Sequence, residues 1–233
     1  MHQMSWSHHL TARLAALATM TWFALIAVSQ TADEPVRHWQ GFVETSFHNT
    51  MDLSFEFGIK YFPIKFVGVG VGIGIGGDIG ELQSTTFEVG DMQVIADDGQ
   101  GVTWFGTGLQ LQSPILWRNG DGDVKLSLKA DAGIRLPFPK NDKISSYVVP
   151  KAAGTWESGP MQFERNHGGA SCFLYFKPAV ALDINRCQVW LGYLLSNMDP
   201  YSGVRNVTIM GHPMTFPHKK TMHGLTLGLG IRF

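Results

Sequence analysis

The sequence predicts an all-β fold, an eight-stranded antiparallel up-and-down β-barrel that crosses a membrane. Apolar residues recur at every second position over long segments, the connections between these segments alternate between short and long, and aromatic residues gather at segment ends. Only 16% of the 233 residues are charged, against about 25% in an average soluble domain. The formal net charge of −1 and the 2 Cys exclude a basic nucleic-acid-binding chain and a disulfide scaffold.

The first 29 residues have the pattern of a secretory signal peptide. Arg13 ends a short leading region, and the uncharged run at 14–28 is 15 residues long, shorter than the roughly 20 that a membrane-spanning helix needs. Small residues allow cleavage after Ser29 or after Ala32. We therefore expect residues 1–29 to be removed and residues 30–233 to form the barrel, with a membrane-anchoring helix as the alternative.

Period-2 alternation defines the strands. In residues 124–136 one face is wholly apolar and the other carries four charges, and residues 53–61 and 225–233 repeat this pattern. All such segments together predict eight strands, at 39–47, 52–61, 66–79, 102–117, 124–136, 171–184, 187–196 and 222–233. Each reaches the roughly 9 to 11 residues that a tilted strand needs to cross a bilayer.

The connections provide an independent test of this assignment. The second, fourth and sixth are short, at 62–65, 118–123 and 185–186, and the third, fifth and seventh are long, at 80–101, 137–170 and 197–221. Short periplasmic turns and longer outer loops are typical of membrane barrels, although the first connection, 48–51, is short as well. Residues 144–149 and 161–164 are predicted to form a hairpin above the membrane, with a ten-stranded barrel as the alternative.

Aromatic residues mark both predicted ends of the strands, where amphipathic rings meet the membrane–water interfaces. At the periplasmic ends lie Trp39, Tyr61, Phe62, Phe66, Trp117 and Phe233, and near the outer ends lie Phe47, Phe105, Phe138 and Phe173. We interpret the two groups as two aromatic girdles.

Residues 36–233 resemble the small outer-membrane β-barrel proteins of Gram-negative bacteria, particularly the porin-family barrels of the Bacteroidota. The resemblance rests on residues 57–63, the glycine-alternating strand that follows, and the ending at 224–233. It implies location in the bacterial outer membrane, contact with outer-membrane lipid and lipopolysaccharide, and insertion by the barrel-assembly machinery. Phe233 looks like the insertion signal, and the resemblance establishes neither a pore nor an activity.

An eight-stranded barrel is just narrow enough for side chains to fill its interior, so we expect a plugged lumen. The inward positions carry six basic and four acidic residues, which we expect to pair because an unpaired buried charge costs several kcal/mol. This predicted polar network consists of Glu44, Glu56, Lys60, Lys125, Lys129, Asp131, Arg135, Lys177, Asp183 and Arg232. An ion or small-ligand pathway is the alternative.

Strand 66–79 presents only glycine to the predicted lumen, at Gly68, Gly70, Gly72, Gly74 and Gly76. Glycine in a strand suits a close approach to the backbone. We expect long Lys and Arg side chains from strands 124–136 and 171–184 to fill this space, with a small cavity as the alternative. The glycine spacing also matches a dinucleotide fingerprint, but no helix pattern follows it, so we predict no cofactor.

Other reactive residues are few. Cys172 and Cys187 are predicted to be free thiols, because the hairpin at 185–186 leaves them near opposite rims. Residues 119–123 lack the later Glu of a calcium loop, which predicts a tight turn and no metal site. A surface lipid hydrolase would use Ser, His and an acid at the outer end, where the chain has His167, Ser171, His212, His218 and His223. We nevertheless predict no enzyme and no catalytic residue.

The outer loops differ in charge. Loop 80–101 has five acidic and no basic residues, whereas loop 197–221 has three basic residues and one acidic. This contrast suits contact with lipopolysaccharide and its bridging divalent ions, or with an unidentified surface partner. The predicted function is an outer-membrane barrel with a structural or surface-interaction role. A narrow channel for small solutes is the first alternative, and a surface lipid hydrolase is the second.

Overall fold

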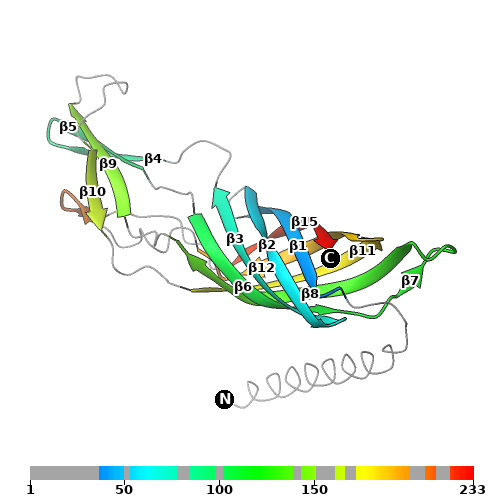
Figure 1. The fold of residues 1–233 in the computed structure, drawn as a ribbon. Helices are drawn as coiled ribbons and strands as arrows, with labels where there is room; N and C mark the ends of the chain where they lie inside the picture. Colours follow the sequence, from blue (N-terminus) through cyan, green and yellow to red (C-terminus); the bar gives the residue numbers. More distant parts are fainter. Residues whose placement is uncertain are drawn as a thin grey trace, which may run out of the picture.

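In the computed structural model, eight long strands close into an antiparallel barrel (Figure 1). The described residues are 37–49, 53–77, 84–97, 102–138, 143–150, 161–165, 172–199, 208–213 and 221–233. The barrel strands are β1 (Trp39–His48), β2 (Leu53–Ile64), β3 (Val67–Gly77), β6 (Val102–Gln112), β8 (Val124–Pro137), β11 (Phe173–Ile184), β12 (Cys187–Ser196) and β15 (Met222–Arg232). Each pairs with the next, and β15 pairs with β1 to close the ring, which confirms the predicted fold class.

The barrel is apolar outside and polar inside. Along β2, Ser54, Glu56 and Lys60 are buried, whereas Phe57 on the opposite face is 55% exposed. The exterior of every barrel strand carries exposed large apolar side chains, far more than a soluble protein leaves in water. In a closed barrel every strand forms its backbone hydrogen bonds with its two neighbours, and the apolar side chains face outward to the lipid. These are the features that allow strands to cross a bilayer, so the chain is a transmembrane barrel.

The predicted strand ends need one correction. The strand predicted at 102–117 ends at Gln112, because Pro114 has no backbone N–H to continue the ladder. The chain then turns and forms the short strand β7 (Trp117–Arg118), which pairs with the start of β8. The Lys65 turn, this excursion after Gln112 and the turn at Asn185 lie at one end of the barrel, called here the short-turn end.

The long connections carry a second sheet beyond the other end of the barrel (Figure 1). It contains β4 (Ser84–Val89), β5 (Met92–Asp97), β9 (Lys143–Pro150) and β10 (Met161–Arg165) in the order β10-β9-β5-β4. The hairpin predicted within the fifth connection is therefore confirmed, and the ten-stranded barrel is wrong. The β4–β5 hairpin, which turns at Gly90, was not predicted from the sequence. A short hairpin, β13 (Thr208–Ile209) and β14 (His212–Pro213), lies in the seventh connection.

Aromatic side chains pack against the glycine face of β3, and this corrects the expectation that Lys and Arg from β8 and β11 would fill it. Trp104 is the cross-strand partner of Gly74, where an added Cβ would collide with the indole ring. Phe62 packs against Gly68 in the same way. Lys60, which meets Gly70, comes from the neighbouring strand β2. Flat rings fill the space because a glycine backbone lets them lie directly on the strand.

Seven of the ten predicted girdle aromatics lie on the exterior, and three do not. Phe62, Phe66 and Phe173 are buried and point into the barrel, so their assignment to the girdles is wrong. Each is an even number of residues from an inward position of its own segment, Lys60, Gly68 or Lys177, so period 2 places its side chain in the lumen; nearness to a strand end was a misleading signal. The exposed members are Trp39, Phe47, Tyr61, Phe105, Trp117, Phe138 and Phe233.

The predicted signal peptide at 1–29 lies outside the described residues. Among the residues that the structure does describe, no helix is long and apolar enough to span a membrane.

Two glycines in this barrel wall differ in the space around them and provide a test. At Gly58 an added Cβ would collide with the backbone oxygen of Val71 and lie 2.7 Å from the Cα of Gly72, whereas at Gly41 nothing lies within 4 Å. We expect Gly58→Ala to lower the free energy of unfolding by about 2 kcal/mol or more, because backbone atoms must move. Gly41→Ala should change it by less than about 1 kcal/mol. Urea unfolding in lipid vesicles measures both, and equal effects would contradict the packing described.

Candidate functional site

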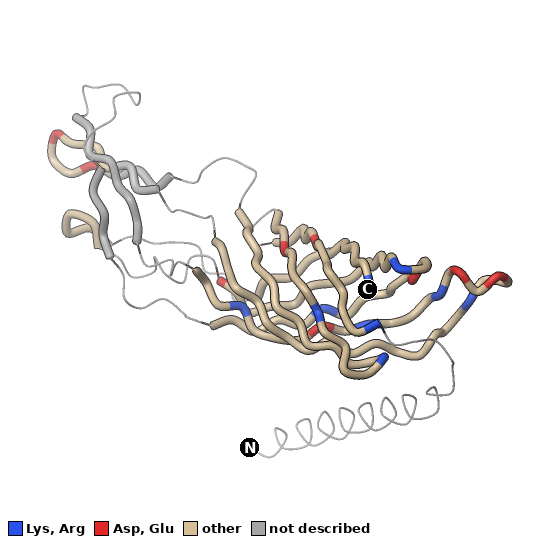
Figure 2. Tube along the Cα trace, viewed as in Figure 1, with Lys and Arg blue, Asp and Glu red and all other residues tan. Residues whose placement is uncertain are grey.

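The middle of the barrel lumen is occupied by a buried network of three carboxylates and four cations. Its members, called here the central network, are Glu44, Glu56, Lys60, Lys129, Asp131, Arg135 and Lys177, all buried. Figure 2 shows Lys and Arg in blue and Asp and Glu in red at positions along the barrel strands. The members of the central network project inward from β1, β2, β8 and β11 because each occupies the polar phase of an alternating strand.

Three short ion pairs connect the barrel walls. Lys177 Nζ lies 2.6 Å from Glu44 Oε1, which joins β11 to β1. Between β2 and β8, a terminal guanidinium nitrogen of Arg135 lies 2.8 Å from Glu56 Oε2. The same two strands are joined again by Lys60 Nζ, 2.9 Å from Asp131 Oδ1. None of these pairs joins neighbouring strands, so the network braces the barrel across its interior.

Weaker contacts join two of the pairs and add Lys129 to the third. Lys177 Nζ also lies 3.8 Å from Glu56 Oε2, and Lys129 Nζ lies 3.5 Å from Asp131 Oδ2. Neutral side chains also form hydrogen bonds with these charged groups. Lys60 Nζ donates to Gln110 Oε1 at 2.7 Å, and Trp190 Nε1 donates to Glu44 Oε2 at 2.9 Å. Hydrogen bonds to these buried charges reduce the desolvation cost that a bare ion pair would carry.

The four cations outnumber the three carboxylates, and aromatic faces balance part of the difference. Lys129 Nζ, which has no hydrogen-bond partner, lies 3.4 Å from the centroid of the Trp190 ring. The guanidinium of Arg135 lies 4.6 Å from the Trp104 ring. Cations over indole faces gain the most when they are desolvated, as they are here.

The centre of the lumen is almost completely filled. The cavity beside Phe42, Lys60 and Tyr175 has a volume of about 10 Å³, roughly the space of one water molecule. Among the described residues, side chains therefore fill the space at the glycine face and leave a cavity of only about 10 Å³. A solute could pass this point only if the central network came apart.

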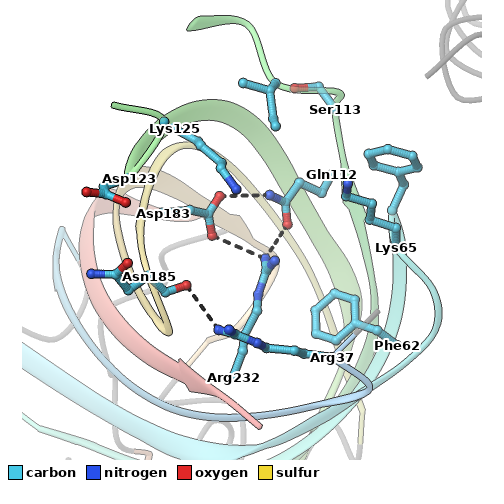
Figure 3. Close-up of a pocket in the computed structure, with 13 residues that line it drawn as sticks. Arg37, Phe62, Lys65, Gln112, Ser113, Asp123, Lys125, Asp183, Asn185 and Arg232 are labelled. Atoms are coloured by element: carbon cyan, nitrogen blue, oxygen red, sulfur yellow. Dashed lines mark hydrogen bonds and ion pairs between the residues drawn. The ribbon is translucent and has the colours of Figure 1, made fainter. Parts of the chain in front are cut away.

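The other three predicted members lie at the short-turn end and are only partly buried. Arg232 lies 3.5 Å from Asp183 and donates to Gln112 Oε1 at 2.6 Å. Asp183 also accepts from Gln188 Nε2 at 2.8 Å, and Lys125 lines the same region. A pocket of about 330 Å³ opens here (Figure 3). The structure thus divides the ten predicted residues between a buried centre and an open end.

Sequence reasoning missed the neutral partners in the lumen. Gln40, Gln110, Gln112 and Gln188 are buried on inward positions and make hydrogen bonds inside the barrel. Their alternation with exposed apolar neighbours was a usable signal. Applied to every inward polar residue and not only to the charged ones, this alternation predicts the four glutamines as well.

The predicted histidine set is not brought together among the described residues. His223 Nδ1 lies 2.8 Å from the hydroxyl of Tyr193, His212 is exposed in β14, and His167, Ser171 and His218 lie outside the described ranges. A different pair, His48 Nε2 and Ser54 Oγ, lies 3.1 Å apart, but Ser54 is buried. In the described part of the chain no group of His, Cys, Asp and Glu side chains is arranged to hold a metal ion.

The cysteines and the terminal residue lie on the exterior. Cys172 and Cys187 are exposed free thiols, as predicted, and Cys187 pairs with Ile184 across the hairpin. Phe233 is 63% exposed, and its backbone exchanges hydrogen bonds with Trp39 where the barrel closes.

Comparison with known proteins found no matching family model and no matching curated protein. A de novo designed transmembrane β-barrel is similar, with 6% identity, a TM-score of 0.44, and coverage of 87% of this chain and 100% of the design. Neisserial surface protein A has 12% identity and a TM-score of 0.40, with coverage of 84% of this chain and 96% of that protein. The N-terminal barrel domain of Pseudomonas aeruginosa OprF has 9% identity and a TM-score of 0.37, with coverage of 83% of this chain and 97% of that domain. Similarities this distant assign neither a family nor a function.

The location follows from the chain's own surface. An apolar belt around a closed antiparallel barrel with a polar interior is the architecture of outer-membrane proteins. The chain is therefore an outer-membrane barrel.

The ion pair between Lys177 and Glu44 provides a test of the central network. Lys177→Met leaves Glu44 buried with Trp190 as its remaining donor, so we expect a loss of about 3–5 kcal/mol in the free energy of unfolding. Adding Glu44→Gln should recover part of that loss, because both charges are then gone. Urea unfolding in vesicles measures the cycle, with Arg118→Met on exposed β7 as the single-charge control. A double variant no more stable than Lys177→Met would contradict the coupling.

Proposed function

We propose that the chain serves a structural or surface-interaction role in the outer membrane and that its lumen does not conduct solutes. The observation that carries this proposal is the central network, which fills the lumen with paired charges and aromatic rings. A route for solutes would require several buried ion pairs to separate at once, and each separation leaves charges without partners.

The sheet β10-β9-β5-β4 supports a role on the outer side. It extends the chain beyond the barrel with a paired backbone rather than with loops alone. Such a platform suits contact with lipopolysaccharide head groups or with a surface partner. The apolar belt provides the contact with outer-membrane lipid, and Phe233 at the end of the last strand suits recognition by the barrel-assembly machinery. Membership of the porin-family barrels of the Bacteroidota remains a prediction from sequence.

Two other functions have weaker support. A narrow channel would need an open path through the centre of the lumen, where the cavity beside Lys60 has a volume of only about 10 Å³. A lipid hydrolase would need an accessible Ser–His pair, and the one such pair among the described residues, Ser54 with His48, is buried. Neither alternative has an observation in its favour that the structural role lacks.

Bilayer conductance separates the structural role from the channel. We expect the refolded barrel to give no stepwise current in planar bilayers, because the central network closes the lumen. A 16-stranded porin in the same bilayers is the positive control. Heat-dependent gel mobility would verify that the silent protein is folded, and discrete current steps from the folded wild type would overturn the closed-lumen proposal.

A cellular test addresses the role itself. Cells that lack the chain should take up a hydrophobic dye faster than wild-type cells, because a structural barrel contributes to the membrane barrier. The wild-type chain should restore the barrier, and a variant with residues 84–97 replaced by a Gly-Ser link tests whether the outer sheet is needed. Equal dye uptake with and without the chain would contradict a structural role.

A further inference from the structure

The pocket at the short-turn end is a separate compartment of the lumen. It has a volume of about 330 Å³, at the lower limit of pockets that hold small ligands. The turn at Lys65, the end of β6, the start of β8, the turn at Asn185 and the end of β15 contribute its lining. Figure 3 shows these side chains converging on a common space.

A layer of amides closes the inner end of this pocket. Gln40 Nε2 donates to Gln188 Oε1 at 3.1 Å, and Gln188 Nε2 lies 3.5 Å from Gln112 Oε1. All three side chains are buried. The pocket is therefore a dead end, and a molecule that enters it is held there rather than passed along the lumen.

The charged lining of the pocket is mainly basic. Arg37, Lys65, Lys125 and Arg232 face it, against the two acidic residues Asp123 and Asp183. This leaves an excess of two positive side-chain charges. Asp183 is already engaged, since it accepts from Gln188 and Gln112 and lies near Arg232. Asp123 is exposed at the rim.

Two of the arginines have donors that the protein does not use. Arg37 donates one hydrogen bond, at 3.1 Å, to the neutral backbone oxygen of Asn185, and it has no ion pair with a described carboxylate. Arg232 keeps a buried Nε without a hydrogen-bond partner. The Arg232 guanidinium lies 5.3 Å from the Phe62 ring, which holds it in place. Figure 3 shows the two guanidinium groups on the same side of the pocket. Both are positively charged, so they repel each other.

We propose that this pocket binds a phosphate group that reaches it from the short-turn side. A phosphate monoester or inorganic phosphate carries close to two negative charges near neutral pH, which matches the excess charge of the lining. Its oxygens accept the forked donors of arginine well, and an anion between Arg37 and Arg232 removes their repulsion. Lys65 adds a third positive charge at the wall. The source of the phosphate is either a soluble ion or a lipid head group.

A titration with inorganic phosphate tests this site. The full chain is refolded in phosphatidylcholine nanodiscs, and backbone amide NMR shifts are followed as phosphate is added at constant ionic strength. We expect saturable shifts confined to residues around the pocket, among them Arg37, Lys65 and Asn185. Shifts that do not saturate, or that spread over the whole short-turn end, would overturn the proposal.

Two matched variants separate a built site from general attraction. Arg37→Gln should weaken phosphate binding about tenfold, because a charge-assisted hydrogen bond to the ligand is lost. Arg186→Gln removes the same charge from the exposed turn at the same end, outside the pocket, and should change binding less than twofold. Equal losses in the two variants would mean that only the overall charge matters. Both residues are exposed, and heat-dependent gel mobility verifies that both variants fold.

A lipid arm identifies the source of the phosphate. The titration is repeated in nanodiscs that contain phosphatidic acid, whose head group is a phosphate monoester. If head groups occupy the pocket, the apparent phosphate affinity of the wild type should fall, and Arg37→Gln should abolish this competition. An unchanged affinity assigns the pocket to a soluble phosphate.

Discussion

The rest of the structure depends on one constraint: the hydrocarbon core of a bilayer offers no hydrogen-bond partner to the backbone. Closing the ladder between β15 and β1 removes the last free edge, and it also decides what each face of a strand must be. The outward face becomes apolar because it meets lipid. The inward face is shielded from both lipid and bulk water, so Glu44, Glu56 and Asp131 can be kept there only together with the cations opposite them.

The alternation of apolar and polar residues was enough to predict most of the fold, because a period of two assigns each residue of a barrel strand to the lipid or to the lumen. It could not predict which inward side chains meet, since that depends on register and on the curvature of the ring. Trp104 opposite Gly74 is a result of register, and expecting Lys and Arg there was the error. Pro114 marked the end of β6 in the sequence. Alternation across residues 102–117 concealed this signal.

The lumen has two parts with different chemistry. The central network is tightly packed, with its cations beside carboxylates and indole rings, and the cavity beside Lys60 has a volume of only about 10 Å³. Beyond the amides of Gln40, Gln112 and Gln188, the same polar phase of the strands opens to solvent and leaves donors unused at Arg37 and Arg232. The sequence predicted the two parts as one network, because both contain acidic and basic residues on the inward face of the strands. The two parts differ in their position along the barrel axis, which the charge pattern does not reveal.

The pairing of a tryptophan with a glycine across two strands also constrains how this chain can change over generations. Gly228 gains a side chain only by displacing the ring of Trp190, and shortening Trp190 first leaves a void beside Glu44 and Lys129. Whichever of the two residues is substituted first, the intermediate protein is less stable. We therefore expect the two positions to change together or not at all. Gly74 and Trp104 are tied in the same manner. The barrel thus has pairs of sites whose mutational paths are coupled by shape alone.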